Sequence, residues 1–124
     1  MRRLVSKDIA SLYNSKLKNE EVDGLFEAIL TLRDMDDCYR FFEDLCTINE
    51  IAALAQRMNV AKQLQTGRTY VAIAEETGAS TATISRVSRC LVYGAGGYKR
   101  VLERLKEQEE AQKEGETVNG ADNG

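Results

Sequence analysis

The stretch that decides the fold is residues 70–91, which read YVAIAEETGASTATISRVSRCL. Ala74 is a small residue inside a short apolar-periodic segment, and Gly78 follows four positions later. Two helices that cross steeply approach closely near their turn, and a small side chain at Ala74 allows this approach. Gly78 has no Cβ, so it suits a turn that requires positive φ. The spacing predicts a helix-turn-helix over residues 69–92, the module that places one helix in a DNA groove.

The second helix of this motif has an apolar side and a basic side. Ile84, Val87 and Leu91 fall at i, i+3 and i+7, so they share the inner side. The outer side combines small or hydroxyl side chains, which approach base edges closely, with arginines, which bind guanine or phosphate. A helical hairpin inside a core would share the glycine and the apolar spacing, but not the basic outer side. We predict that the DNA-contacting residues are Ser80, Thr81, Ala82, Thr83, Ser85, Arg86 and Arg89.

Two local signals complete the motif. Ser80 or Thr81 can cap the second helix by accepting hydrogen bonds from its free backbone N–H groups. Arg68 lies immediately before the motif, where phosphate contacts usually fix the orientation of a DNA-binding protein. We therefore predict a phosphate contact for Arg68.

Composition limits the remaining functions. A chain of 124 residues corresponds to one domain, and its core is small enough that association with a second copy would help. The chain has no proline, which suits an all-helical fold, and no histidine, the commonest general base and metal ligand. Its three cysteines form no CxxC pair, and no apolar run approaches the ~20 residues of a membrane span. We expect no catalytic site, metal or cofactor, no membrane partner, and a cytoplasmic location.

Charge is segregated along the chain, although the net charge is −3. Residues 51–106 carry nine basic and three acidic side chains, whereas residues 20–50 carry two basic and ten acidic ones. A local basic surface can bind phosphate on an acidic protein, because salt screens charges beyond ~8–10 Å. The acidic segment leaves one alternative open, a protein-binding adaptor that uses the surface of residues 20–50. RNA binding is disfavoured because stacking aromatic residues are few.

Helix signals predict about six helices. Asn19 can cap a first helix that ends near Leu32. Thr47 and Glu50 form a capping box at the start of a longer helix to Gln65, with Ile51, Leu54, Ala55, Met58 and Leu64 on its inner side. The expected helices cover residues 19–32, 36–45, 47–65, two in the helix-turn-helix, and 98–112. We expect a basic N-terminal arm at residues 1–18 (or a short helix around Ser6 to Tyr13), an all-helical DNA-binding domain at 19–112, and a disordered tail at 113–124.

Two segments carry a resemblance to a known family. CTINEIAALAQRMNVAKQLQTG, residues 46–67, resembles the long central helix of the Trp repressor family, and TGASTATISRVSRCL, residues 77–91, resembles its turn and recognition helix. The resemblance covers about residues 25–106 and is closer to the YerC/YecD branch than to the tryptophan-sensing repressor. It implies a bacterial transcription regulator, an all-α intertwined homodimer whose two recognition helices enter successive major grooves of double-stranded DNA.

The resemblance also assigns roles to single positions. It places Thr81, Ala82 and Ser85 at base-contacting positions. The residues that match the lining of the repressor's tryptophan pocket, a candidate effector pocket here, are Thr47, Arg57 and Arg86.

Three departures affect that pocket. Val87 stands where the repressor has a glycine that makes room for the indole, Cys90 where a serine would bind the amino group, and Asp44 where the wall is aliphatic. We therefore expect that L-tryptophan is not the ligand. The two arginines of the pocket would then bind a different anion or amino acid. Alternatively, they pair with Asp44, Glu50 or a partner's carboxylate, or contact phosphate.

Overall fold

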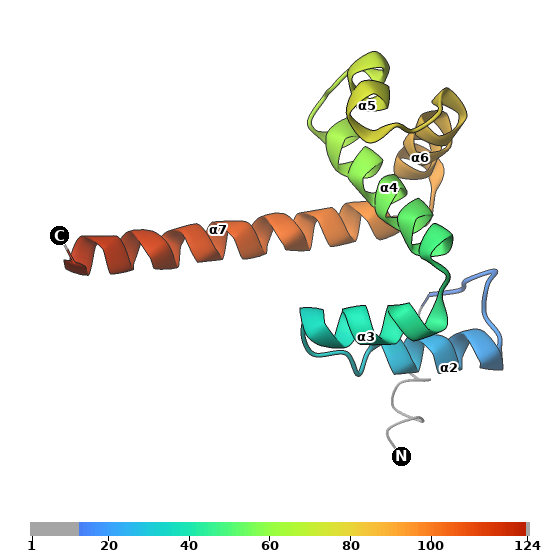
Figure 1. Cartoon of the computed structure of the whole chain (residues 1–124), viewed down its shortest axis with the longest axis horizontal. Coiled ribbons are helices and arrows are strands. Elements are labelled where there is room, and N and C mark those ends of the chain that lie inside the picture. Colours follow the sequence, from blue (N-terminus) through green and yellow to red (C-terminus); the bar gives the residue numbers. More distant parts are fainter. Residues whose placement is uncertain (1–12, 124) are drawn as a thin grey trace. The chain divides into compact units, whose positions relative to one another are not determined.

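The protein is all-α, as the sequence predicts. Its computed structural model describes the backbone of residues 13–123 and the side chains of residues 13–116. This part of the chain contains six α-helices and no strand (Figure 1). The chain divides into two units, residues 1–45 and 46–124. Most of the predicted N-terminal arm, including the segment around Ser6, lies outside the described residues.

The first unit contains helices α2 (Glu20–Ile29) and α3 (Met35–Leu45). Asn19 caps α2 as predicted, because its side-chain oxygen accepts the N–H of Val22 at 2.8 Å. The predicted end of this helix at Leu32 is wrong. The N–H groups of Thr31 and Leu32 bond to the carbonyls of Ala28 and Ile29, three residues back, which tightens the chain out of the α-helical pattern.

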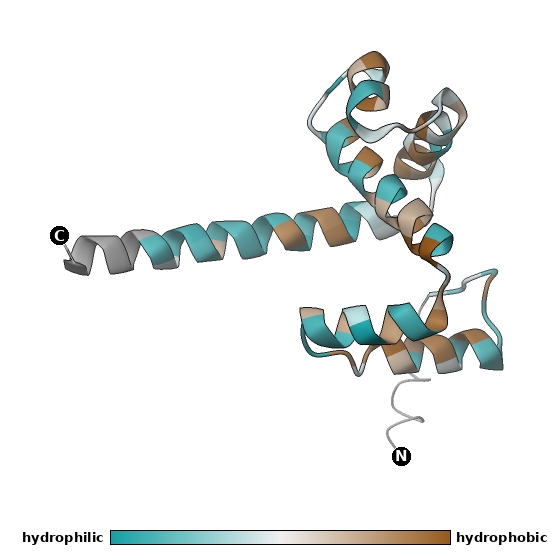
Figure 2. Ribbon diagram, in the orientation of Figure 1, coloured by the Kyte–Doolittle hydropathy of each residue, from teal (hydrophilic) through white to brown (hydrophobic). Residues whose placement is uncertain are grey.

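Neither α2 nor α3 buries a single residue. Phe26 on α2 is 48% exposed and Tyr39 on α3 is 64% exposed. Amphipathic helices gain most of their stability by packing an apolar face against another element. The first unit therefore does not bury its apolar residues by itself; these residues are brown on the ribbon of Figure 2.

The second unit contains α4 (Ile48–Gln65), α5 (Tyr70–Thr77), α6 (Thr81–Tyr93) and α7 (Gly97–Asn123). Helices α5 and α6 pack against the C-terminal half of α4, and the start of α7 closes the group (Figure 1). The buried apolar core comes from all four helices and the α5–α6 turn: Val60, Ala61, Ile73, Ala79, Ile84, Val87 and Leu102.

The predicted inner side of α4 needs correction. Val60, Ala61 and Gln63 are buried, whereas Leu54 is 46% exposed. Met58 and Leu64, which the sequence also placed on the inner side, are partly buried and pack against the core, so the prediction is right for these two and wrong for Leu54. Leu54 is therefore an apolar residue of α4 that the core of the second unit does not cover.

Helix α7 is longer than expected. It runs from Gly97 to Asn123, so the structure differs from the predicted end near Gln112 and from the predicted disorder after it. The segment after 112 has no proline, and its glycines lower helix propensity by only about 1 kcal/mol each. Between residues 97 and 116 the large apolar side chains of α7 lie in its first turns, around Leu102 and Leu105, and most residues after them are hydrophilic (Figure 2).

Candidate nucleic-acid interface

The turn between α5 and α6 is fixed by short-range hydrogen bonds. Thr69 caps α5, since its hydroxyl accepts the N–H of Ala72 at 3.2 Å. Gly78 ends α5 with φ +72°, in the left-handed region that the sequence requires of it. Ser80 caps α6 by accepting the N–H of Thr83 at 3.1 Å, which decides between the two predicted caps. These caps set the direction in which α6 leaves the turn.

Two residues of the turn were not predicted from the sequence. The Thr77 hydroxyl donates to the carbonyl of Ile73 at 2.7 Å and accepts the N–H of Ala79 at 3.1 Å. The Gln56 amide nitrogen donates to the carbonyl of Thr77 at 3.2 Å and so ties α4 to the turn. A threonine before a C-cap glycine is a usable signal, because its hydroxyl can bond locally. Gln56 has no such signal, since its partner is twenty-one positions away.

The inner side of α6 is packed as the spacing predicts. Ile84 and Val87 are each 1% exposed and pack with Val60 and Ile73. Leu91 is partly buried against the same core. Burial of these side chains fixes the rotation of α6 about its own axis, and so decides which residues remain outside.

The outer side of α6 carries the predicted DNA-contacting residues. Thr83 is half-buried, and the exposed members of this set are Ser80, Thr81, Ala82, Ser85, Arg86 and Arg89. Among the residues that the structure describes, neither Arg86 nor Arg89 forms an ion pair. The result is a convex helical ridge of small and hydroxyl side chains flanked by two guanidiniums that are available to phosphates or base edges.

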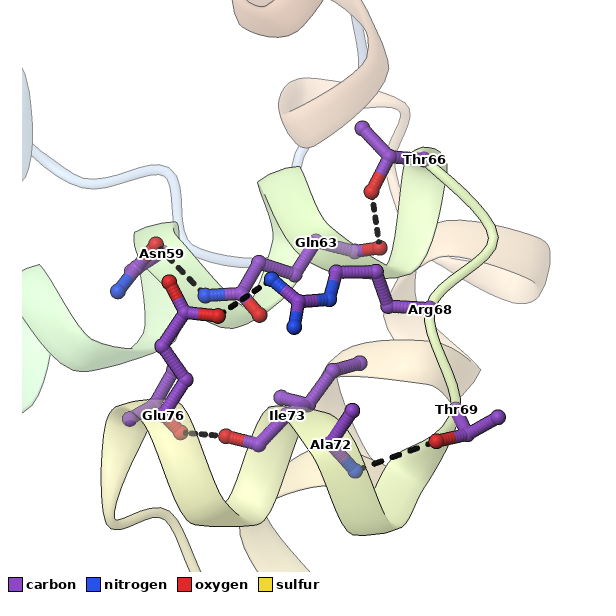
Figure 3. A network of polar contacts seen from close by, with 9 residues as sticks. Asn59, Gln63, Thr66, Arg68, Thr69, Ala72, Ile73 and Glu76 are labelled. Atoms are coloured by element: carbon purple, nitrogen blue, oxygen red, sulfur yellow. Dashed lines mark hydrogen bonds and ion pairs between the residues drawn. The ribbon is translucent and has the colours of Figure 1, made fainter.

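Arg68 lies between α4 and α5, as its predicted role at the edge of the motif requires, but it has a partner within the chain. Its guanidinium Nη1 donates to the Glu76 carboxylate Oε2 (Figure 3). The Arg68 and Glu76 side chains are 45% and 51% exposed. Nearby, the amide nitrogen of Gln63 donates to Asn59 at 3.3 Å, while the buried Gln63 Oε1 has no hydrogen-bond partner among the described residues.

The three residues of the candidate effector pocket come from the N-cap of α4, from α4 itself and from α6. Within the described residues, no hydrogen bond or ion pair links Thr47, Arg57 and Arg86 to one another. Arg57 is half-buried on α4, and Arg86 is exposed on α6. Of the carboxylates that the sequence offers them, Glu50 forms no ion pair with either arginine among the described residues, and Asp44 belongs to the first unit.

Thr47 has a structural role at the start of α4. Its hydroxyl accepts the N–H of Glu50 at 3.1 Å, and its own N–H donates to the Glu50 carboxylate at 2.8 Å, so the predicted capping box is present. The bond from the Thr47 backbone N–H, followed by the bond to its side chain, holds the pKa of Glu50 below its ordinary value. Both the hydroxyl and the backbone N–H of Thr47 therefore take part in capping α4.

No group of three or more histidine, cysteine or acidic residues among the described residues could hold a metal ion. Cys38, Cys46 and Cys90 are free thiols. No helix in residues 13–123 is both long and apolar enough to cross a bilayer. What the arrangement offers is a stable, outward-facing helix with hydrogen-bonding and cationic side chains.

Comparison with known proteins agrees with this geometry. The profile of the family described as Trp repressor protein matches residues 20–106. Protein YerC of Bacillus subtilis is 61% identical over 94 residues, which cover 76% of this chain and 90% of YerC.

Two crystal structures are similar over most of the chain. A candidate Trp repressor of Staphylococcus aureus has a TM-score of 0.71 at 53% identity, and covers 73% of this chain and 91% of its own. A TrpR-like protein of Eubacterium eligens has a TM-score of 0.72 at 63% identity, and covers 75% of this chain and 96% of its own.

Proposed function

The chain belongs to the Trp repressor family, and from this premise we propose that it is a sequence-specific transcription regulator that binds double-stranded DNA as a homodimer. Helix α6 enters the major groove, and α5 lies across its entrance. The observation that carries this proposal is the outer side of α6, where Ala82, Ser85 and Arg89 are all exposed while the opposite side of the helix is buried.

The exposed residues match the chemistry of base recognition. Ala82 and the methyl group of Thr81 can contact a thymine methyl, and Ser85 can donate to or accept from a base edge. Arg86 and Arg89 can bind guanine through two hydrogen bonds or contact phosphates. Arg68, at the start of the motif, would contact the phosphate backbone and fix the orientation of the helix.

Uncovered apolar surface supports a homodimer. Ile48 at the start of α4 is 87% exposed, and Leu54 and Val101 remain nearly half exposed. Helices α2 and α3 bury nothing. A hollow of about 300 Å³ between α4 and α7 is lined by Leu102 and Leu105 among others. A second copy would cover these surfaces, and a two-fold dimer would present two α6 helices to half-sites ~34 Å apart.

The position of Val87 supports the proposal that L-tryptophan is not the effector. The indole pocket of the tryptophan-sensing repressor has a glycine at this position, whereas the Val87 side chain is 1% exposed and packed against the core. A ring could enter only if the valine left that core. Thr47, Arg57 and Arg86 remain candidates for a different anionic effector, and an effector of any kind stays a prediction.

Selection of bound sequences from a random duplex library tests the DNA-binding proposal. The full chain, first verified as a folded dimer, should enrich one pseudo-palindrome whose half-sites are one helical turn apart. If the dimer contacts about six phosphates, its affinity should fall ~10³-fold between 50 and 200 mM salt.

Failure to enrich any motif would overturn the proposal. That result would favour the alternative function, a protein-binding adaptor whose binding surface is formed by the largely exposed carboxylates of residues 20–50. A protein partner whose binding survives charge reversal at both Arg86 and Arg89 would favour the adaptor as well.

A further inference from the structure

Within the proposed DNA-binding function, on which this inference rests, we propose that Glu76 is an internal competitor for phosphate at Arg68. In the free protein Glu76 holds the Arg68 guanidinium, and on DNA a phosphate oxygen replaces its carboxylate. Glu76 thereby lowers the sequence-independent affinity of the protein and makes that affinity less dependent on salt.

Hydrogen bonds between α4 and α5 hold the backbone of Arg68 in place. Its backbone N–H donates to the Gln63 carbonyl at 3.3 Å, and the preceding Gly67 N–H donates to the Leu64 carbonyl at 3.1 Å. The next residue, Thr69, is the N-cap of α5. Arg68 therefore leaves the chain at a fixed point at the beginning of the helix-turn-helix, where a phosphate contact would set the register of the protein on DNA.

The partner of Arg68, Glu76, lies in the last turn of α5. Glu76 lies eight positions further on, and its carboxylate accepts from Arg68 Nη1 (Figure 3). The two charges cancel each other, so the pair as a unit attracts DNA less than a free arginine would. About half of each side chain is exposed to water, so the guanidinium can exchange partners without unfolding any element.

Neighbouring Glu75 provides a matched comparison. It carries the same charge on the same helix and is exposed, but among the described residues no ion pair involves it. Neutralising Glu75 removes the same long-range repulsion toward DNA as neutralising Glu76. Any additional effect at Glu76 must therefore come from its contact with Arg68.

The exchange has a definite thermodynamic signature. A free Arg68 that binds a phosphate releases about 0.9 of a condensed cation per contact. When Glu76 must first be displaced, its freed carboxylate attracts a cation from solution, which offsets part of that release. The slope of log affinity against log salt is then shallower, by up to about 0.9 for each protomer.

The experiment measures binding of the full-length protein to a fluorescent duplex of mixed sequence by anisotropy, from 50 to 200 mM KCl. The variants are E76Q, E75Q, R68Q and the double variant E76Q/R68Q, each checked for helicity by circular dichroism. We expect E76Q to bind more tightly than E75Q at 50 mM. Its advantage should shrink about three- to fourfold per protomer by 200 mM, and should vanish in the R68Q background.

Two results would overturn the inference while leaving DNA binding intact: equal affinities and slopes for E76Q and E75Q, or an E76Q gain that persists without Arg68. If the unmodified protein binds no DNA even at 50 mM, the proposed function fails and this inference fails with it. The three results are distinguishable in a single titration series.

Discussion

Replacing Val87 by alanine is the sharpest test of how α6 is packed. Val87 is 1% exposed, so the change removes two fully buried carbons at about 0.8 kcal/mol each, and a residual cavity adds to the loss. Alanine's better helix propensity returns about 0.5 kcal/mol. We expect V87A to lower the free energy of unfolding by about 2 kcal/mol, which would shift the urea midpoint by about 1 M.

The matched control is Val92→Ala, the same substitution on the same helix. Val92 is 63% exposed, so its loss of burial is small and is nearly offset by the gain in helix propensity. Both variants are unfolded in urea at one protein concentration and followed by circular dichroism, because the stability of a dimer depends on concentration. If V87A is no less stable than V92A, then Val87 is not a core residue, and the argument against an indole pocket at this position fails.

Three further predictions concern the dimer, the effector and the first helix cap. Leu54→Lys places a charge on the uncovered side of α4, so sedimentation velocity should find monomers where the unmodified chain gives dimers; an unchanged dimer would place the interface elsewhere. Calorimetric titration with L-tryptophan should give no binding, and a micromolar dissociation constant would contradict the role assigned to Val87. Because the pKa of Glu50 is lowered in the folded state, the stability that it contributes is complete above the ordinary glutamate pKa of about 4.3 and is lost as the pH falls through its folded value. Unfolding of wild type and E50Q between pH 6 and 3 should therefore show the wild type losing stability relative to the variant, and a difference that does not change with pH would refute this.

The helix-turn-helix could be predicted because its signals are local. Gly78 at positive φ, the cap at Ser80 and the spacing of Ile84 and Val87 each depend on residues within a few positions of one another. The capping box at Thr47 is local in the same sense. In each case the backbone geometry constrains the residue type directly, so the sequence pattern and the structure agree.

The inner side of α4 and the end of α7 could not be predicted in the same way. Helix α4 has apolar residues along its whole length, and periodicity alone does not say that Val60 meets the core of its own chain while Leu54 stays exposed. For α7 the polar composition after residue 112 is compatible with either helix or disorder.

Interactions between distant positions were missed for a related reason. Gln56 bonds to the carbonyl of Thr77, and Arg68 pairs with Glu76, because the fold brings these residues together. No sequence spacing marks either pair. The phosphate contact of Arg68 stays a prediction, and its ion pair with Glu76 is visible only in three dimensions.

The central claim is that α6 reads DNA with its outer side, and charge reversal at Arg89 tests it most directly. Binding of R89E to the selected duplex is compared with binding of R40E, which makes the same change in net charge on α3 of the other unit, where Arg40 pairs with Asp36. Loss of an arginine that reads a base costs about 1–3 kcal/mol, so we expect R89E to weaken binding at least about fivefold and R40E to leave it nearly unchanged. Equal affinities for the two variants would contradict the account, because they would mean that α6 does not enter the groove.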